Sequence, residues 1–235
     1  VLDSRDALER RADLDGDGAV EVLSRSIDGI AVTKRVGGVF VETMVLSAPM
    51  SYTQFAQLTI GDFDADGDLD VIESHAPVFT LPERPLYLEN RNGSLVLDAN
   101  AGPADTGVYY AAARGDIDGD GRLDFVAWKG NVVVVYRNLG HGNFEAPRQL
   151  YVGVYGNVND SGAGRLWVDD LDGDGDLDLA VGIRVFVFDA IIVLSNDGTG
   201  VFTSLIVSGV TAEGLAVVGS SDVDQNGQRD LLVED

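Results

Sequence analysis

The sequence contains no cysteine, only two histidines, and no apolar run long enough to cross a bilayer. Without cysteine there is no disulfide, no thiol nucleophile and no thiolate metal site. The longest unbroken apolar segments, residues 132–136 and 190–194, are far shorter than the roughly 18 residues of a membrane helix. No basic segment followed by an apolar stretch opens the chain. The sequence therefore predicts no transmembrane segment and shows no signal peptide.

Basic residues are also scarce. There are 16 Lys and Arg against 39 Asp and Glu, which gives a formal net charge of −23. A field of this sign repels nucleic acids and attracts small cations, so we expect no nucleic-acid partner. The remaining composition, with 45% hydrophobic residues, is that of a globular chain. The 29 glycines indicate many tight turns.

A nine-residue acidic pattern occurs five times. The copies occupy residues 13–21, 62–70, 116–124, 170–178 and 222–230, and their starts are 49, 54, 54 and 52 residues apart. Positions 1, 3, 5 and 9 of each copy are Asp, Glu or Asn, and position 6 is always Gly. This near-constant spacing indicates an internal structural repeat. We refer to these copies as loops 1 to 5 and number their residues 1 to 9.

A second signal lies inside each period. It reads Asn-x-Gly-x-Gly-x-Phe at residues 138–144 and 196–202, with weaker forms at 34–40 and 90–95. Short β-branched or aromatic runs precede and follow both signals, and no segment shows a helical period of useful length. Four strands per repeat predict an all-β fold, a β-propeller of four-stranded antiparallel blades, as a single domain over residues 1–235.

The strands expected first in their blades are residues 55–60, 109–113, 164–168 and 215–218. The second strands are 70–73, 124–128, 178–183 and 230–233, and the third are 29–34, 85–89, 132–137 and 191–195. Fourth strands are expected to open at Phe40, Leu95, Phe144 and Phe202.

The blade count is uneven, because five loops accompany only four Gly-rich signals. We therefore expect about five repeats that form part of a larger propeller, an open array, or a ring completed by another chain. An unclosed end leaves an unpaired sheet edge, which favours self-association.

The acidic loops have the chemistry of a calcium site. Carboxylates at positions 1, 3 and 5 converge if the chain turns sharply at position 6, where glycine tolerates positive φ. Position 7 can add a backbone carbonyl, and position 9 is acidic in every copy. Such hard oxygen ligands suit Ca²⁺ better than Mg²⁺. The predicted metal residues are Asp13, Asp15, Asp17, Ala19 and Glu21; Asp62, Asp64, Asp66, Asp68 and Asp70; Asp116, Asp118, Asp120, Arg122 and Asp124; Asp170, Asp172, Asp174, Asp176 and Asp178; Asp222, Asp224, Asn226, Gln228 and Asp230.

The loops contain 21 of the 39 acidic residues. Four carboxylates about 6 Å apart repel one another by roughly 4 kcal/mol per loop even in a water-like dielectric. We therefore expect up to five bound Ca²⁺ ions, with the weakest site in loop 5, where Asn226 stands at position 5. An EF-hand is disfavoured, because it requires flanking helices and a Glu at position 12, and only Glu73 meets the second requirement.

The sequence resembles a known family of repeat proteins. Residues 61–72, followed by the Asn-x-Gly-x-Gly-x-Phe signal, resemble the FG-GAP/VCBS-type repeat over almost the whole chain. The resemblance implies an integrin-α-like propeller with a calcium loop between strands 1 and 2 of each blade. It also implies a secreted or cell-surface protein of bacterial type. The Phe-Gly…Gly-Ala-Pro signature of integrin chains is missing, so integrin-specific ligand recognition is not implied.

No catalytic constellation is visible, and we expect that the chain is not an enzyme. His141 is expected in a solvated turn and His75 at a rim on the opposite face, and there is no Gly-x-Ser-x-Gly or phosphate loop. Candidate ligand residues on the face opposite the loops are Tyr52, Gln54, Tyr109, Tyr110, Tyr155, Asn157, Asn159, Glu213, Arg25, His75, Arg84, Lys129 and Arg184. In the simpler interpretation, Tyr109 and Tyr110 pack between blades and the polar residues are solvated. Trp128 and Trp167 are expected to be packing residues within strands.

Three functions remain open. The first is a calcium-stabilised recognition or adhesion module for a glycan or protein ligand. The second is a domain of a carbohydrate-active enzyme such as a polysaccharide lyase, and the third is an architectural surface or filament subunit.

Overall fold

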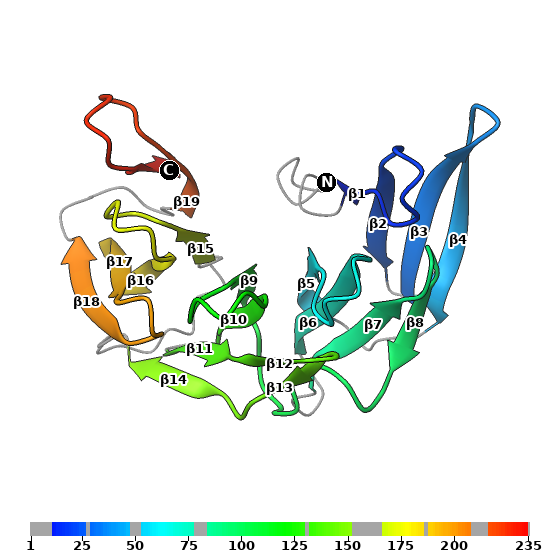
Figure 1. Cartoon of the computed structure of the whole chain (residues 1–235), viewed down its shortest axis with the longest axis horizontal. Helices are drawn as coiled ribbons and strands as arrows, with labels where there is room; N and C mark the ends of the chain where they lie inside the picture. The colour runs from blue at the N-terminus through cyan, green and yellow to red at the C-terminus, as the bar shows by residue number, and fades with distance from the viewer. Residues whose placement is uncertain are drawn as a thin grey trace. The chain divides into compact units, whose positions relative to one another are not determined.

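The computed structural model describes residues 11–26, 29–47, 53–77, 84–129, 132–151, 166–185, 188–207 and 216–234. Their regular secondary structure consists of β-strands alone, arranged in four four-stranded and two two-stranded antiparallel sheets (Figure 1). The all-β prediction is therefore confirmed. None of these residues forms a helix with the length and hydropathy of a membrane span.

Each of the first two repeats forms one sheet whose strands follow chain order. The first sheet consists of β1 (Arg11–Ala12), β2 (Glu21–Ser26), β3 (Gly29–Val36) and β4 (Val39–Ser47). The second consists of β5 (Thr53–Gly61), β6 (Asp70–Pro77), β7 (Leu86–Asn90) and β8 (Leu95–Asp98).

The later repeats continue this plan. The third sheet consists of β9 (Ala111–Gly115), β10 (Asp124–Trp128), β11 (Val132–Tyr136) and β14 (Arg148–Tyr151), with a separate hairpin of β12 (Asn138–Gly140) and β13 (Asn143–Phe144). The fourth consists of β15 (Leu166–Asp169), β16 (Asp178–Val185), β17 (Phe188–Asn196) and β18 (Phe202–Val207). The fifth has β19 (Ala216–Ser221) and β20 (Asp230–Glu234).

The predicted four-stranded pattern is confirmed, and every acidic loop joins strands 1 and 2 of its repeat. The third repeat departs from the prediction of a fourth strand that opens at Phe144. There β13 ends at Phe144, and the outer strand β14 begins only at Arg148. Pro147 lies between them, and proline has no N–H to donate to a strand ladder.

By their contacts, the residues group into two compact units. One contains residues 1–108 and 138–146, and the other contains 109–137 and 147–235. The single domain expected over residues 1–235 stays a prediction. The first core contains Leu23, Leu58 and Val71. The second unit has a core cluster that includes Val126, Val133 and Leu179.

Strand β10 of the second unit is buried along its whole length. All five of its side chains are buried, because sheet residues cover both of its faces. It pairs with β9 from Asp124↔Gly115 to Trp128↔Ala111. The two ends of loop 3 are therefore fixed by a rigid strand pair.

Candidate metal sites

All five acidic loops have the same backbone turn. The position-6 glycines have φ between +84° and +99°, as the sequence predicts. Position 4 is also left-handed in every loop, with φ between +61° and +82°. Two of these position-4 residues, Ala65 and Gln225, are not glycine. Glycine at position 4 of the other three loops was the sequence signal for this second left-handed residue.

Backbone N–H groups hold the acidic side chains inside the loop. In every loop the glycine at position 6 donates to the carboxylate of position 1, at 2.9–3.1 Å. The N–H of position 7 donates to the side-chain oxygen of position 5, at 2.7–3.0 Å. Each side chain therefore has one oxygen fixed by the backbone, and the loop geometry is set before any ligand is added.

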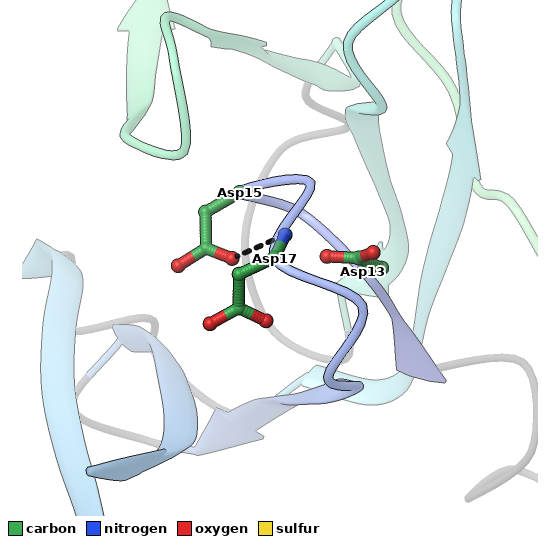
Figure 2. Close-up of side chains that lie close together, drawn as sticks. All are labelled: Asp13, Asp15 and Asp17. Atoms are coloured by element: carbon green, nitrogen blue, oxygen red, sulfur yellow. Dashed lines mark hydrogen bonds between the residues drawn. The ribbon is translucent and has the colours of Figure 1, made fainter.

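Three acidic side chains converge in each loop, with one oxygen from each lying within 4.8 Å of the others. Figure 2 shows this convergence for Asp13, Asp15 and Asp17 of loop 1. The second cluster uses the same positions 1, 3 and 5, whereas the last three clusters use positions 1, 3 and 9. The four remaining clusters are Asp62, Asp64 and Asp66; Asp116, Asp118 and Asp124; Asp170, Asp172 and Asp178; Asp222, Asp224 and Asp230.

The acidic residue at position 9 also accepts a backbone hydrogen bond from its own loop. In every loop its carboxylate accepts the N–H of position 2, at 2.8–3.1 Å. Asp70 also accepts the Tyr87 hydroxyl at 2.6 Å and the N–H of Asn90 at 2.8 Å. Burial raises the pKa of Asp70 to about 6, although these hydrogen bonds favour its charged form. Position 9 therefore ties the loop to its own sheet.

Some oxygens in these clusters lack a hydrogen-bond partner. Asp13 Oδ1 is buried and accepts no hydrogen bond, whereas the buried carboxylate of Asp118 forms an ion pair with Arg137. Buried charged oxygens are costly unless a cation or donor compensates them. A cluster that offers only oxygen atoms suits a hard cation, so the residues present fit Ca²⁺. The predicted contribution of the position-7 carbonyls stays a prediction.

A buried asparagine links each of three successive pairs of repeats. Asn90, Asn138 and Asn196 open the Gly-rich signals of repeats 2, 3 and 4. Each donates from Nδ2 to the position-2 carbonyl of the loop one repeat earlier, at 2.7–2.8 Å. Sequence reasoning identified this signal without giving it a role. The recurring Asn was the available clue.

The first repeat has Lys34 at this position. Its ammonium group lies 2.5 Å from Asp15 Oδ2 of its own loop. That contact raises the pKa of Lys34 and lowers the pKa of Asp15, because each charged form favours the other.

The prediction that His75 is a rim residue is wrong. The His75 side chain is only 2% exposed, and its Nδ1 lies 3.1 Å from Glu73 Oε2. Arg25 contacts the other oxygen of Glu73 at 3.3 Å, and its side chain is 4% exposed. Alternation along β6 puts Glu73 and His75 on the same face, and Arg25 compensates the buried Glu73 carboxylate. His141, in contrast, is exposed in a turn with φ +54°, as predicted.

The other described ligand candidates also contact groups of the protein itself. Tyr109 is fully buried and its hydroxyl lies 3.0 Å from that of Tyr136, which confirms the packing interpretation for Tyr109. Lys129 Nζ lies 4.9 Å from the centre of the Tyr109 ring. Arg84 donates to the Ala99 carbonyl at 3.1 Å.

The two tryptophans lie in strands, as predicted. Trp128 is buried in β10, and Trp167 packs against a core cluster of the fourth and fifth repeats. The remaining candidates lie outside the described residues or side chains: Tyr52, Gln54, Tyr155, Asn157, Asn159, Arg184 and Glu213.

Repeated four-stranded sheets with an acidic loop between strands 1 and 2 define a propeller-like repeat protein. The sequence pattern of the FG-GAP-like repeat matches residues 13–72 and 116–181, more than half of the chain. The chain therefore belongs to the FG-GAP-like repeat family. No curated protein matches the sequence.

The solved structures that resemble this fold include the following two. One is an Agrocybe aegerita lectin described by its specific recognition of non-reducing terminal N-acetylglucosamine. It aligns with a TM-score of 0.62 and 19% identity, over 95% of this chain and 59% of the lectin. The other is the V. cholerae biofilm matrix protein Bap1, with a TM-score of 0.51 and 18% identity, over 83% of this chain and 28% of Bap1. This chain thus spans about three fifths of the lectin, and at these identities the likeness shows the fold.

Proposed function

We propose that this chain is a calcium-stabilised extracellular recognition or adhesion module with a glycan or protein ligand. The observation that supports calcium is the common bonding scheme of the five loops, which brings three acidic side chains together in each. The ion would be held by the carboxylates of positions 1 and 3, together with that of position 5 in loops 1 and 2 or position 9 in loops 3 to 5. A bound cation would cancel their repulsion and compensate oxygens such as Asp13 Oδ1 that accept no hydrogen bond.

The proposed recognition function is supported by the fold of this chain. The similar structures include a lectin and a biofilm matrix protein, both of which are described by roles outside enzyme catalysis. We propose the same class of role and no catalytic activity for this chain. The burial of His75 and Tyr109 supports the absence of catalysis, because a buried imidazole or phenol cannot reach a substrate to transfer a proton.

A glycan array tests the ligand. The purified chain should bind a subset of glycans in Ca²⁺, and probes that end in N-acetylglucosamine are the first to compare. Binding should disappear in chelator and return with Ca²⁺ but not with Mg²⁺. Ultraviolet absorbance should stay flat on uronic-acid polymers, where a polysaccharide lyase would raise it. Binding that ignores chelator would contradict the calcium role, and failure to bind any probe would contradict a glycan ligand.

Exposed apolar side chains of the fifth repeat support self-association as a second function. The position-2 side chains of loops 1 to 4 are at most 9% exposed, whereas Val223 of loop 5 is 63% exposed. Phe63 illustrates how the others are covered, because it packs edge-on against Phe144 of the next repeat at 6.0 Å. Leu232 and Val233 of β20 are each 41% exposed. We propose that a second copy of the chain covers Val223 and the exposed side chains of β20.

Sedimentation over a concentration series tests this association. The chain should dimerise or polymerise as its concentration rises, and Val223→Asp should weaken the association at least about tenfold by placing a charge in an apolar contact. Val201→Asp is the matched control, since Val201 is 49% exposed in a different turn. A chain that stays monomeric at the highest concentration would overturn the proposal.

A further inference from the structure

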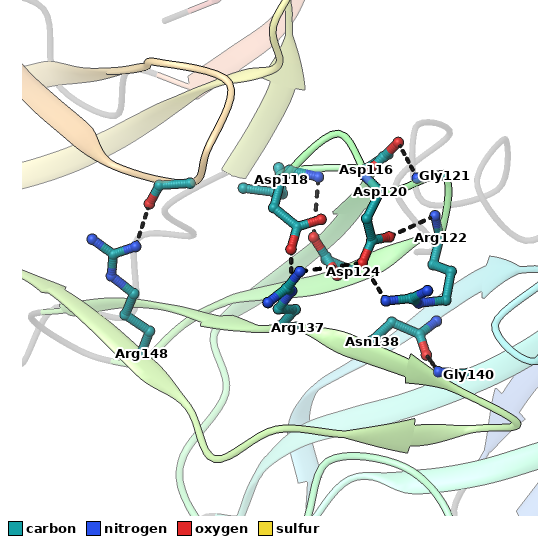
Figure 3. A network of polar contacts seen from close by, with 12 residues as sticks. Asp116, Asp118, Asp120, Gly121, Arg122, Asp124, Arg137, Asn138, Gly140 and Arg148 are labelled. Atoms are coloured by element: carbon teal, nitrogen blue, oxygen red, sulfur yellow. Dashed lines mark hydrogen bonds and ion pairs between the residues drawn. The ribbon is translucent and has the colours of Figure 1, made fainter.

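Loop 3 differs from the other four loops because two arginines form ion pairs with its carboxylates. Arg137, directly after β11, forms an ion pair through Nε with Asp118, and its Nη2 lies 3.5 Å from Asp120 Oδ2. Arg122, at position 7 of the loop itself, forms an ion pair with Asp120. Figure 3 shows both guanidinium groups pointing into the acidic cluster.

The corresponding residues of other repeats have the opposite charge or none. Position 7 is Asp68 in loop 2 and Asp176 in loop 4, where loop 3 has Arg122. The residue before the linking asparagine is Glu89 in repeat 2 and Ser195 in repeat 4, where repeat 3 has Arg137.

These substitutions change the charge balance around the site. Loops 2 and 4 each have five acidic residues, whereas loop 3 has four together with two arginines.

Asp118 shows what the arginines do. Its side chain is 11% exposed, and both of its carboxylate oxygens are buried. A carboxylate in this environment needs a compensating positive charge, and Arg137 supplies one. A guanidinium is permanently charged and presents its donors in a plane, so it matches a pair of carboxylates well.

We propose that Arg122 and Arg137 serve as the built-in cation of loop 3, so that this loop keeps its fold without metal and binds Ca²⁺ much more weakly than loops 2 and 4. The proposal rests on the proposed calcium function of the other loops.

Calcium counting on the full chain by native mass spectrometry tests the proposal. The variant Arg122→Asp gives loop 3 the position-7 residue of loops 2 and 4, and Arg122→Gln with Arg137→Gln removes both cations. Each variant should bind one more Ca²⁺ than the wild type at the same free calcium. The affinity of the added site should exceed that of wild-type loop 3 by about tenfold or more, since ligand charge sets calcium affinity. Arg91→Gln, which removes an arginine paired with Glu89 outside the loops, is the matched control and should leave the count unchanged.

Melting temperature in chelator provides a second measurement. The double variant should melt below the wild type in chelator and recover in Ca²⁺, because the metal then replaces the lost guanidinium groups. If the wild type already fills five equally strong sites and the variants change nothing, the proposal that the arginines act as a built-in cation is wrong. If the wild type binds no Ca²⁺ at all, the calcium function itself fails. Arg122→Asp alone decides the question if the double variant does not fold.

Discussion

Excess chelator should lower the melting temperature of this chain by more than about 10 °C, and Ca²⁺ should restore it far better than Mg²⁺. An empty loop of four carboxylates contains roughly 4 kcal/mol of mutual repulsion. For a chain of this length, each 1 kcal/mol corresponds to about 2–4 °C of melting temperature. Thermal unfolding followed by circular dichroism, after prolonged chelation to remove slowly released ions, measures the shift. A melting curve that is indifferent to chelator would contradict the proposed metal sites.

The pH dependence in chelator gives an independent check. The pKa values of Asp64, Asp70 and Asp178 are raised, with burial as the largest cause, and that of Asp70 reaches about 6 from an ordinary 3.8. Between these values the native state binds protons that the unfolded state has released, so stability falls as pH rises. The metal-free chain should therefore melt at a higher temperature at pH 5 than at pH 7. In saturating Ca²⁺ the order should reverse, because the metal favours the ionised carboxylates.

Asn196→Ala should destabilise the chain by about 2–4 kcal/mol, because it leaves buried backbone groups without partners. The Asn196 side chain is 4% exposed and donates to the Ile117 carbonyl at 2.7 Å and the Leu177 carbonyl at 3.1 Å. Its Oδ1 accepts the N–H of Gly200 at 3.0 Å. Chemical denaturation in saturating Ca²⁺ measures the loss.

Asn143→Ala is the matched control for Asn196→Ala. Asn143 is exposed in the Gly-rich turn of the third repeat and donates only to nearby turn carbonyls, at 3.1 and 3.2 Å. Its loss should cost less than about 1 kcal/mol, since solvent can replace these bonds. Equal effects of the two variants would show that the link between repeats adds little stability.

The loops and strands that depend on neighbouring residues could be predicted well from the sequence. The acidic loops, the Gly-rich signals and the strands between them depend on residues close together in the chain, such as position-6 glycines that permit positive φ. The predicted strand 124–128 matches β10 at both ends. The boundary that failed, at Phe144, depends on where Pro147 allows strand pairing to resume.

The sequence alone determined that this chain is an all-β repeat protein with five acidic loops, since both properties come from short patterns and their spacing. Only the tertiary structure decided which distant groups compensate one another. It placed Arg137 on Asp118, joined Asn196 to the Ile117 carbonyl 79 residues away, and buried His75 beside Glu73. Such contacts depend on how strands and repeats pack against one another, and no local pattern determines which partner a long polar side chain will meet.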